Sequence, residues 1–243
     1  MFPIDRAVET IRHHGLALAD AADGNFTARV DCCPRWDVAD LVWHIRRVHY
    51  FWGSMVEGLL DDPDRVPEIE RPTDEYQLLA DYRTGVVRMA EILNNADQTA
   101  RIWTWSHQKD VAFVTRHQVQ ETAVHHWDAE TAAGKRTQIE PDVAADSVDE
   151  FLEHSTPGRL PDAEPLFGSV HLHATDTEGE WVIKEDEDRQ LSIVRGHARS
   201  DVALSAPASD LLLVLYRRFG PEPEAVYGDR SLLDRFLDRT DLD

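Results

Sequence analysis

The chain has 243 residues, with 25 basic and 46 acidic side chains and a formal net charge of −21 at pH 7. So few basic groups cannot neutralise rows of phosphates, which argues against binding to nucleic acids and to anionic membrane surfaces. A hydrophobic content of 42% excludes a disordered chain, and no apolar run reaches the ~20 residues of a membrane span. The N-terminal residues lack the basic and apolar segments of a signal peptide, so we expect a cytoplasmic globular protein.

The first two-thirds of the sequence has the apolar spacing of amphipathic helices. The second predicted helix begins at Asp37, a good N-cap with Asp40 three residues later. The fourth stops at Gly134, a typical end signal. Four long helices with connections of this size predict an antiparallel four-helix bundle. The predicted helices, the fifth of them shorter, cover about 3–22, 37–59, 73–93, 110–133 and 141–153.

A boundary between domains is predicted in the segment 155–168, which contains three prolines. After it the hydrophobic period changes to that of short strands, which we expect to form a small antiparallel sheet. We therefore predict a mainly α protein with a bundle domain over 1–155 and a small α+β domain over 169–243. The expected strands and helices of this second domain cover 170–174, 181–183, 191–194, 202–204, 208–218 and 231–237.

A candidate metal site comes from polar residues in the predicted bundle. His117, Glu121 and His125 recur every four residues and so share one side of a helix that also carries apolar residues. An inward carboxylate requires a cation nearby. His44 lies in the apolar stripe of the second helix. Two imidazoles and a carboxylate suit zinc with an open position, or non-haem iron. The same spacing also occurs on solvated faces, so spacing alone leaves both interpretations open.

Other chemically versatile residues have ordinary interpretations. Cys32 and Cys33 are adjacent in the sequence. Adjacent cysteines rarely form a disulfide with each other, so we expect reduced thiols in a loop. Trp103 and Trp105 precede the fourth helix, where core packing is the commoner role and pocket lining the alternative. The remaining histidines are interpreted as surface or core residues: His13, His14, His49, His107, His126, His154, His171, His173 and His197.

Two stretches, PRWDVADLVWHIRRVHYFW and RHQVQETAVHHWDAETAAG, resemble the mycothiol-dependent maleylpyruvate isomerase family. The later stretch DVALSAPASDLLLVLYRRF resembles the small C-terminal domain of that family, so the resemblance covers nearly the whole chain. It implies a DinB-like four-helix bundle followed by a small α+β domain. The family patterns Trp-x-x-x-Asp-Leu-x-x-His and Glu-x-x-x-His-x-x-Asp are met by Trp36, Asp40, Leu41 and His44, and by Glu121, His125 and Asp128.

The resemblance implies that His44, Glu121 and His125 bind Zn²⁺ or another divalent metal, with His117 as a neighbour. Asp128 would then orient a ligand as a hydrogen-bond acceptor, or else serve the end of its helix.

The implied cosubstrate is the thiol mycothiol. Arg217 and Arg218 are the nearest candidates to hold it, and their alternative role is to bind the last carbonyl groups of their helix. Gln120 departs from the many relatives that carry a histidine directly before the glutamate ligand.

The activity implied is that of an isomerase or S-transferase acting on a small electrophilic substrate, with the attacking thiolate supplied by the cosubstrate. A hydrolase with metal-bound water is one alternative. A non-catalytic binding or dimerisation bundle is another, in which Glu121 pairs with Arg46 or Arg47. A homodimer is compatible with the sequence, which sets neither the oligomeric state nor the substrate.

Overall fold

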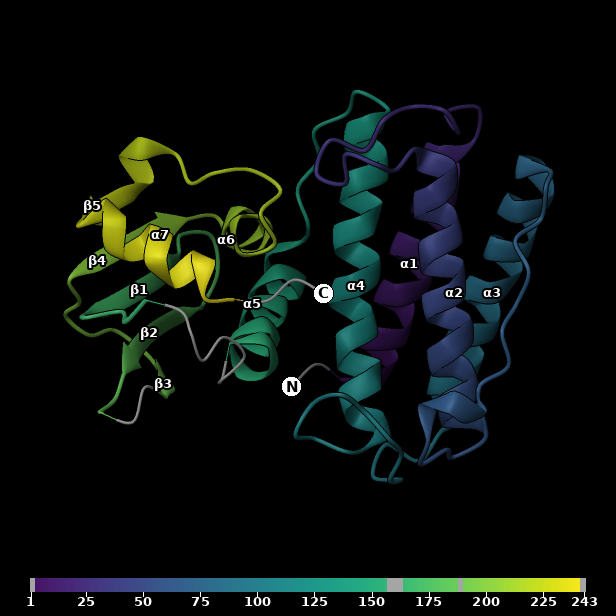
Figure 1. Cartoon of the computed structure of the whole chain (residues 1–243), viewed down its shortest axis with the longest axis horizontal. Coiled ribbons are helices and arrows are strands. Elements are labelled where there is room, and N and C mark those ends of the chain that lie inside the picture. The colour runs from purple at the N-terminus through teal and green to yellow at the C-terminus, as the bar shows by residue number, and fades with distance from the viewer. Residues whose placement is uncertain (1–2, 157–163, 188–189, 241–243) are drawn as a thin grey trace. The chain divides into compact units, whose positions relative to one another are not determined.

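A computed structural model of the chain describes residues 3–156, 164–187 and 190–240. The chain forms two compact units, Met1–Thr137 and Gln138–Asp243. The first unit is helical, and the second combines a five-stranded sheet with helices (Figure 1). These observations confirm the predicted fold class, a mainly α chain with an N-terminal four-helix bundle and a small C-terminal α+β part. None of the helices within the described residues combines the length and the hydropathy of a membrane span.

The boundary between the units lies earlier in the chain than the sequence predicts. We expected the helix after Pro141 to belong to a bundle domain ending at residue 155, but α5 (Pro141–Ser155) packs against α6 (Ala208–Leu215) in the second unit. The backbone N–H of Ile139, just before α5, donates to the Ser209 hydroxyl at 3.1 Å. Helical periodicity shows that a face will be buried and does not show which core buries it. Residues 157–163 of the expected boundary lie outside the described residues.

Four helices make up the bundle: α1 (Ile4–Ala22), α2 (Val38–Glu57), α3 (Glu75–Asn95) and α4 (Val111–Ala132). Helices α1 and α2 each pack against both α3 and α4 (Figure 1). Their facing sides supply large buried side chains, so the core runs along the bundle axis. The arrangement places α2 beside α4, the two helices that carry the candidate metal ligands.

The helices of the bundle do not all alternate in direction. His49 of α2 stacks on Tyr82 of α3. Gly53, one turn after His49 in α2, faces Met89, two turns after Tyr82 in α3. Helices α2 and α3 therefore run parallel, while the contacts of α1 with α3 and of α2 with α4 are antiparallel. The connection 58–74 returns the chain along the bundle to make this possible, and it contains the short 3₁₀ helix η1 (Pro63–Arg65).

Helix α2, which carries His44, begins with a capping box. The Asp37 carboxylate accepts from the backbone N–H of Asp40 at 2.9 Å, and the Asp40 carboxylate accepts from the N–H of Asp37 at 3.2 Å. Arg71 donates to Asp40 at 2.5 Å and so ties the long connection to the start of the helix. These contacts fix where α2 begins and therefore which of its side chains face α4.

The sheet of the second unit has the order β3-β2-β1-β4-β5. Strand β4 pairs with β1 in parallel, and the other neighbours are antiparallel. The predicted antiparallel sheet is therefore wrong for the pair β1 and β4. Strands β2 and β3 lie on one side of β1, and the segment 196–201 then crosses the sheet to place β4 on the other side of β1. The strands are β1 (Ser169–Ala174), β2 (Glu180–Glu185), β3 (Leu191–Arg195), β4 (Val202–Ala206) and β5 (Val226–Gly228), the last of which the sequence did not predict.

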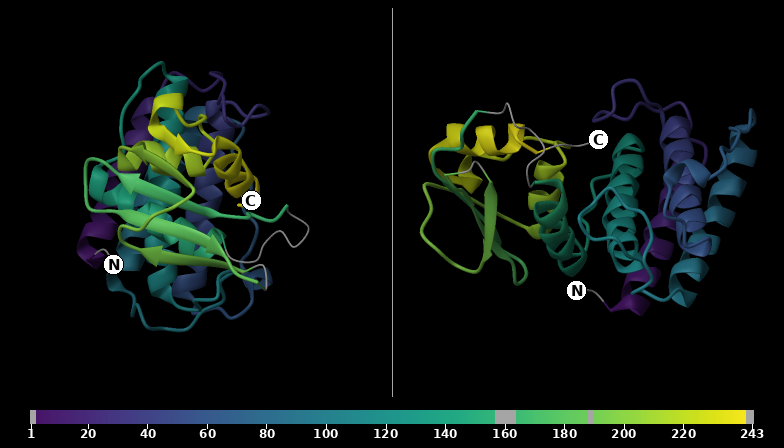
Figure 2. Two further views of the ribbon diagram at one scale, coloured as in Figure 1. Left: turned by 90° about the vertical axis from the view of Figure 1, so that its left-hand side faces the viewer. Right: turned by 60° about the horizontal axis from the view of Figure 1, so that its bottom comes forward.

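One face of this sheet is covered by helices (Figure 2). Helices α6 and α7 (Arg230–Asp238) pack on β1 and β4, and the Trp181 indole of β2 donates to Asp149 of α5 at 2.9 Å. Leu172 of β1 pairs with Trp181 and shares that covered face. Because side chains alternate along a strand, His171 and His173 lie on the opposite face.

Replacing Asp37 with alanine removes one half of the capping box, and we expect the free energy of unfolding to fall by about 1 kcal/mol. Asp37→Ser keeps an acceptor and should retain most of that stability. Asp61→Ala is a control, since this side chain is 90% exposed, and it should change stability by less than about 0.5 kcal/mol. Urea unfolding followed by circular dichroism measures all three. An Asp37→Ala midpoint equal to that of the parent would show that the box contributes nothing.

Candidate metal centre

Three of the predicted site residues meet between α2 and α4. His44 comes from α2, and Glu121 and His125 come from successive turns of α4. Nε2 of His44 lies 3.2 Å from Oε1 of Glu121, and Nε2 of His125 lies 3.5 Å from the same oxygen. One donor atom from each residue lies within 4.8 Å of the other two. The cluster thus gathers two imidazole nitrogens and one carboxylate oxygen, a set that could hold a metal ion.

The cluster is mostly enclosed and opens on the side of His44. The side chains of His44, Glu121 and His125 are 32%, 16% and 10% exposed, respectively. Trp36, which precedes α2, packs against His44 with ring centroids 4.8 Å apart. The His44 and His125 rings stand edge to face at 5.0 Å. These ring contacts restrict the rotation of both imidazoles and hold their nitrogens toward the carboxylate.

Asp128 orients His125 from behind. Its Oδ2 lies 2.8 Å from Nδ1 of His125, and its side chain is fully buried. A carboxylate at Nδ1 keeps the proton on that nitrogen and leaves Nε2 directed at the cluster. Asp128 lies one turn before the last residue of α4, and its contact with His125 matches the ligand-orienting alternative.

Cys32 is a neighbour of the site that the sequence did not reveal. Its thiol donates to Oδ1 of Asp128 at 3.2 Å, and its sulfur lies 3.9 Å from that of Cys33. Both cysteines are reduced and lie in the loop between α1 and α2, as expected. No local pattern links this loop to α4, which is about 96 residues later in the chain, so only the fold reveals the contact.

Without a bound cation, the two carboxylates hold a proton on His125. Burial disfavours the imidazolium ion, but the bonds to Asp128 and Glu121 outweigh burial and raise the pKa of His125 to about 9. Burial also disfavours the ionised form of Glu121, which would raise its pKa. The bonds of Glu121 to His125 and His44 nevertheless hold that pKa well below the ordinary value. A divalent cation would neutralise the same carboxylates and displace the proton.

The sequence matches two family descriptions in succession. Residues 8–130 match the mycothiol maleylpyruvate isomerase N-terminal domain, and residues 142–235 match the MDMPI C-terminal domain. The chain belongs to the mycothiol maleylpyruvate isomerase family. Membership supports an isomerase-like function that depends on mycothiol and uses a small substrate. Neither the curated proteins nor the solved structures gave a match.

In this member of the isomerase family, His117 lies outside the cluster of three. Its ring stacks on Phe113 with centroids 5.4 Å apart and meets the Trp105 indole edge to face at 5.3 Å. Its Nδ1 lies 3.0 Å from the side-chain nitrogen of Gln120. His117 therefore belongs to an aromatic group at the start of α4, one turn before Glu121.

The arginines considered for other roles have different contacts. Arg217 donates to the Leu215 carbonyl at the end of α6 and, at 2.6 Å, to the Thr240 hydroxyl. Arg218 donates to the Tyr216 carbonyl at 3.1 Å. These contacts match the helix-end alternative, and a role for either residue in binding the thiol stays a prediction. Arg46, the alternative partner of Glu121, lies over the Tyr50 ring at 5.6 Å.

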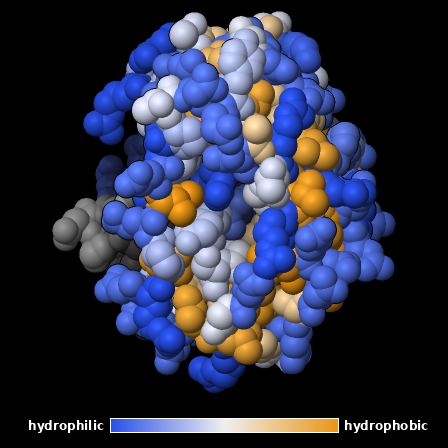
Figure 3. All heavy atoms as spheres, turned by 90° about the vertical axis from the view of Figure 1, so that its right-hand side faces the viewer, coloured by the Kyte–Doolittle hydropathy of each residue, from blue (hydrophilic) through white to orange (hydrophobic). Residues whose placement is uncertain are grey.

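A separate hollow of about 380 Å³ lies between α2 and α3. Charged side chains of both signs line it, among them Arg46, Asp81 and Arg88. Figure 3 shows the face of the molecule on the side of α3, which is mainly hydrophilic with separate hydrophobic side chains. The cluster of His44, Glu121 and His125 lies on the other side of α2, against α4, and none of these three residues lines the hollow.

Sequence reasoning also missed a second histidine cluster, which lies in the C-terminal unit. His171, His173 and His197, interpreted above as surface or core residues, converge on Glu180. The alternation His-x-His in a predicted strand was the available signal, because it puts both rings on one face.

We expect His125 of chelator-treated protein to titrate with a pKa of about 9, and the Asp128→Asn substitution to lower that pKa. The folded-state pKa lies above the unfolded value of about 6.5. The stabilisation is therefore complete below about pH 6.5 and is lost as the pH rises through about 9. Imidazole nitrogen shifts in NMR spectra measure the titration, with Asp64→Asn, an exposed position, as the control. A His125 that is neutral at pH 7 in the parent protein would contradict this.

Proposed function

We propose that the chain is a zinc-dependent isomerase or S-transferase that uses mycothiol on a small electrophilic substrate. The observation that carries the proposal is the convergence of His44, Glu121 and His125 from two facing helices, in a chain that belongs to the mycothiol maleylpyruvate isomerase family. Nitrogen and oxygen donors of this kind fit a divalent transition metal. The inward carboxylate also needs positive charge, which such an ion supplies.

The residues around the cluster prepare it for a thiol. Zn²⁺ held by His44, Glu121 and His125 would act as a Lewis acid that lowers the pKa of a bound thiol. His44 and His125 present Nε2 as donors, and Glu121 supplies negative charge. With a metal bound, Asp128 would retain the proton on Nδ1 of His125 and leave the lone pair of Nε2 for the ion. The exposed edge of His44 is the side from which a thiol can approach.

The proposed isomerisation is an addition followed by an elimination. The thiolate sulfur adds to one carbon of an activated cis double bond, and the displaced electron pair moves to the conjugated carbonyl oxygen. The carbon–carbon bond, now single, rotates. The electron pair then returns, the carbon–sulfur bond breaks, and the trans product and the thiolate are released. Protonation of the adduct before elimination would instead leave the thiol attached, which is the S-transferase outcome.

Replacing Glu121 with glutamine keeps the shape of the side chain and removes its charge. We expect this variant to retain about one equivalent of zinc fewer than the parent, because one of three protein ligands is lost. Metal content of untagged protein purified without chelator, measured by mass spectrometry, tests this. Glu91→Gln, at an exposed position of α3, is the matched control and should keep its metal. A Glu121→Gln protein with the metal content of the parent would refute the proposed ligand set.

Turnover of maleylpyruvate should require both added mycothiol and the metal. Chelation should abolish the activity, and Zn²⁺ should restore it. Asp128→Asn should weaken metal affinity about 10–100-fold, so its activity should recover at higher zinc concentration. The rate is followed by absorbance as the cis substrate is converted.

The alternatives give different results in the same assay. Metal-dependent cleavage of an electrophile without any thiol would favour the hydrolase. A protein that holds no metal at the bundle cluster and is equally stable in chelator would be a binding module.

A further inference from the structure

Two histidines and a glutamate share one face of the C-terminal sheet. His171 and His173 are two residues apart on β1, so both rings leave the strand on the same side. Glu180 of β2 is the register partner of His173. Directly paired residues of antiparallel strands project to the same face. The carboxylate of Glu180 is thus set beside both rings by strand register alone, on the face that α6 and α7 leave uncovered.

The third histidine comes from the segment 196–201, which crosses the sheet from β3 to β4. Gly196 begins the crossing with a φ of +113°, a conformation that favours glycine. Its N–H donates to the Glu180 carbonyl at 2.9 Å, and at the other end the N–H of Asp201 donates to the Ser169 carbonyl at 3.1 Å. Between these anchors His197 lies over β1 and β2, with its ring centroid 5.4 Å from that of His171.

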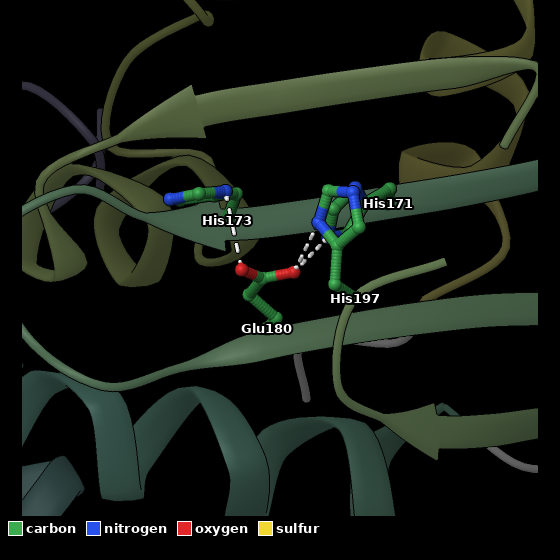
Figure 4. Close-up of side chains that lie close together, drawn as sticks. All are labelled: His171, His173, Glu180 and His197. Atoms are coloured by element: carbon green, nitrogen blue, oxygen red, sulfur yellow. Dashed lines mark hydrogen bonds and ion pairs between the residues drawn. The ribbon is translucent and has the colours of Figure 1, made fainter. Parts of the chain in front are cut away.

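The four side chains converge on one point (Figure 4). Oε2 of Glu180 lies 3.1 Å from Nε2 of His171 and 2.9 Å from Nδ1 of His197, and Oε1 lies 3.6 Å from Nδ1 of His173. One donor atom from each lies within 4.8 Å of all the others. A tetrahedral ion with bonds of ~2.0–2.2 Å holds its donors ~3.3–3.6 Å apart. Small side-chain movements would therefore satisfy that geometry.

We infer that His171, His173, Glu180 and His197 form a second binding site for a divalent transition-metal ion, with zinc as the best match. Three imidazoles are borderline donors, which select such ions over Mg²⁺ or Ca²⁺, and the carboxylate of Glu180 adds negative charge. Four protein ligands fill a tetrahedral shell, so this site is structural: it fastens the crossing segment 196–201 to β1 and β2. The site is independent of the bundle cluster and does not rest on the proposed function.

The surroundings of two of the four side chains, His171 and Glu180, agree with metal binding. His171 is 5% exposed, and its burial holds the pKa of the ring below the ordinary value despite the bond to Glu180. Burial would raise the pKa of Glu180, but the bond to His197 and the charges of the histidines hold it low. A neutral imidazole and an ionised carboxylate are the states that ligate. His197 is 78% exposed, so the ion has a route to the site.

Titration of the untagged 243-residue apoprotein with ZnCl₂ tests the inference. The His44→Ala protein, disabled at the bundle cluster, is the background for each variant. In that background we compare His197→Ala and the isosteric Glu180→Gln with His13→Ala, an exposed histidine outside both clusters. Metal retained after gel filtration is counted by mass spectrometry, and circular dichroism confirms that each protein is folded.

We expect His44→Ala and the His13→Ala control to retain about one equivalent of zinc, and the His197→Ala and Glu180→Gln proteins to bind at least ~10-fold more weakly. Amide hydrogen exchange over 196–201 should slow on zinc addition, by up to ~100-fold at 100 times the dissociation constant, only where His197 and Glu180 are present. Equal metal retention in all four proteins, or no zinc in His44→Ala, would overturn the inference.

Discussion

The inward-facing carboxylate of Glu121 is the main electrostatic constraint on the N-terminal unit. Glu121 projects from α4 toward α2, between the imidazoles of His44 and His125, in a bundle whose other inward side chains are mainly apolar. An ionised carboxylate in such a place is destabilising by several kcal/mol unless positive charge lies beside it. A proton on the imidazoles can supply that charge, and a metal ion held by the imidazoles and the carboxylate would supply it instead. The chemistry proposed for the chain follows from this requirement.

The bundle topology serves that placement. Helices α2 and α4 are neighbours because the connection 58–74 brings α3 back parallel to α2 and leaves the other side of α2 to α4. The capping box at Asp37 fixes the start of α2, and Asp128 fixes the ring of His125. The C-terminal unit meets a similar requirement on a different scaffold, where strand register and a crossing segment place three imidazoles around Glu180.

Much of this could be predicted from local signals. The cap at Asp37 and the stop at Gly134 set helix ends within a few residues, and four-residue spacing put Glu121 and His125 on one face. Features that depend on tertiary packing could not be predicted. The direction of α3 depends on a connection with no hydrophobic period, and the place of α5 depends on which core accepts its apolar face. His197 lies on a non-repetitive segment, so nothing local linked it to β1.

The proposed function requires that the cluster of His44, Glu121 and His125 between α2 and α4 binds a metal ion. X-ray diffraction from crystals of metal-loaded protein, recorded on either side of the zinc absorption edge, tests this requirement. We predict an anomalous difference peak at metal–ligand distance, about 2.0–2.2 Å, from Nε2 of His44, a carboxylate oxygen of Glu121 and Nε2 of His125. The absence of a peak beside these three atoms, with His125 still paired with Glu121, would show that the cluster is not a metal site.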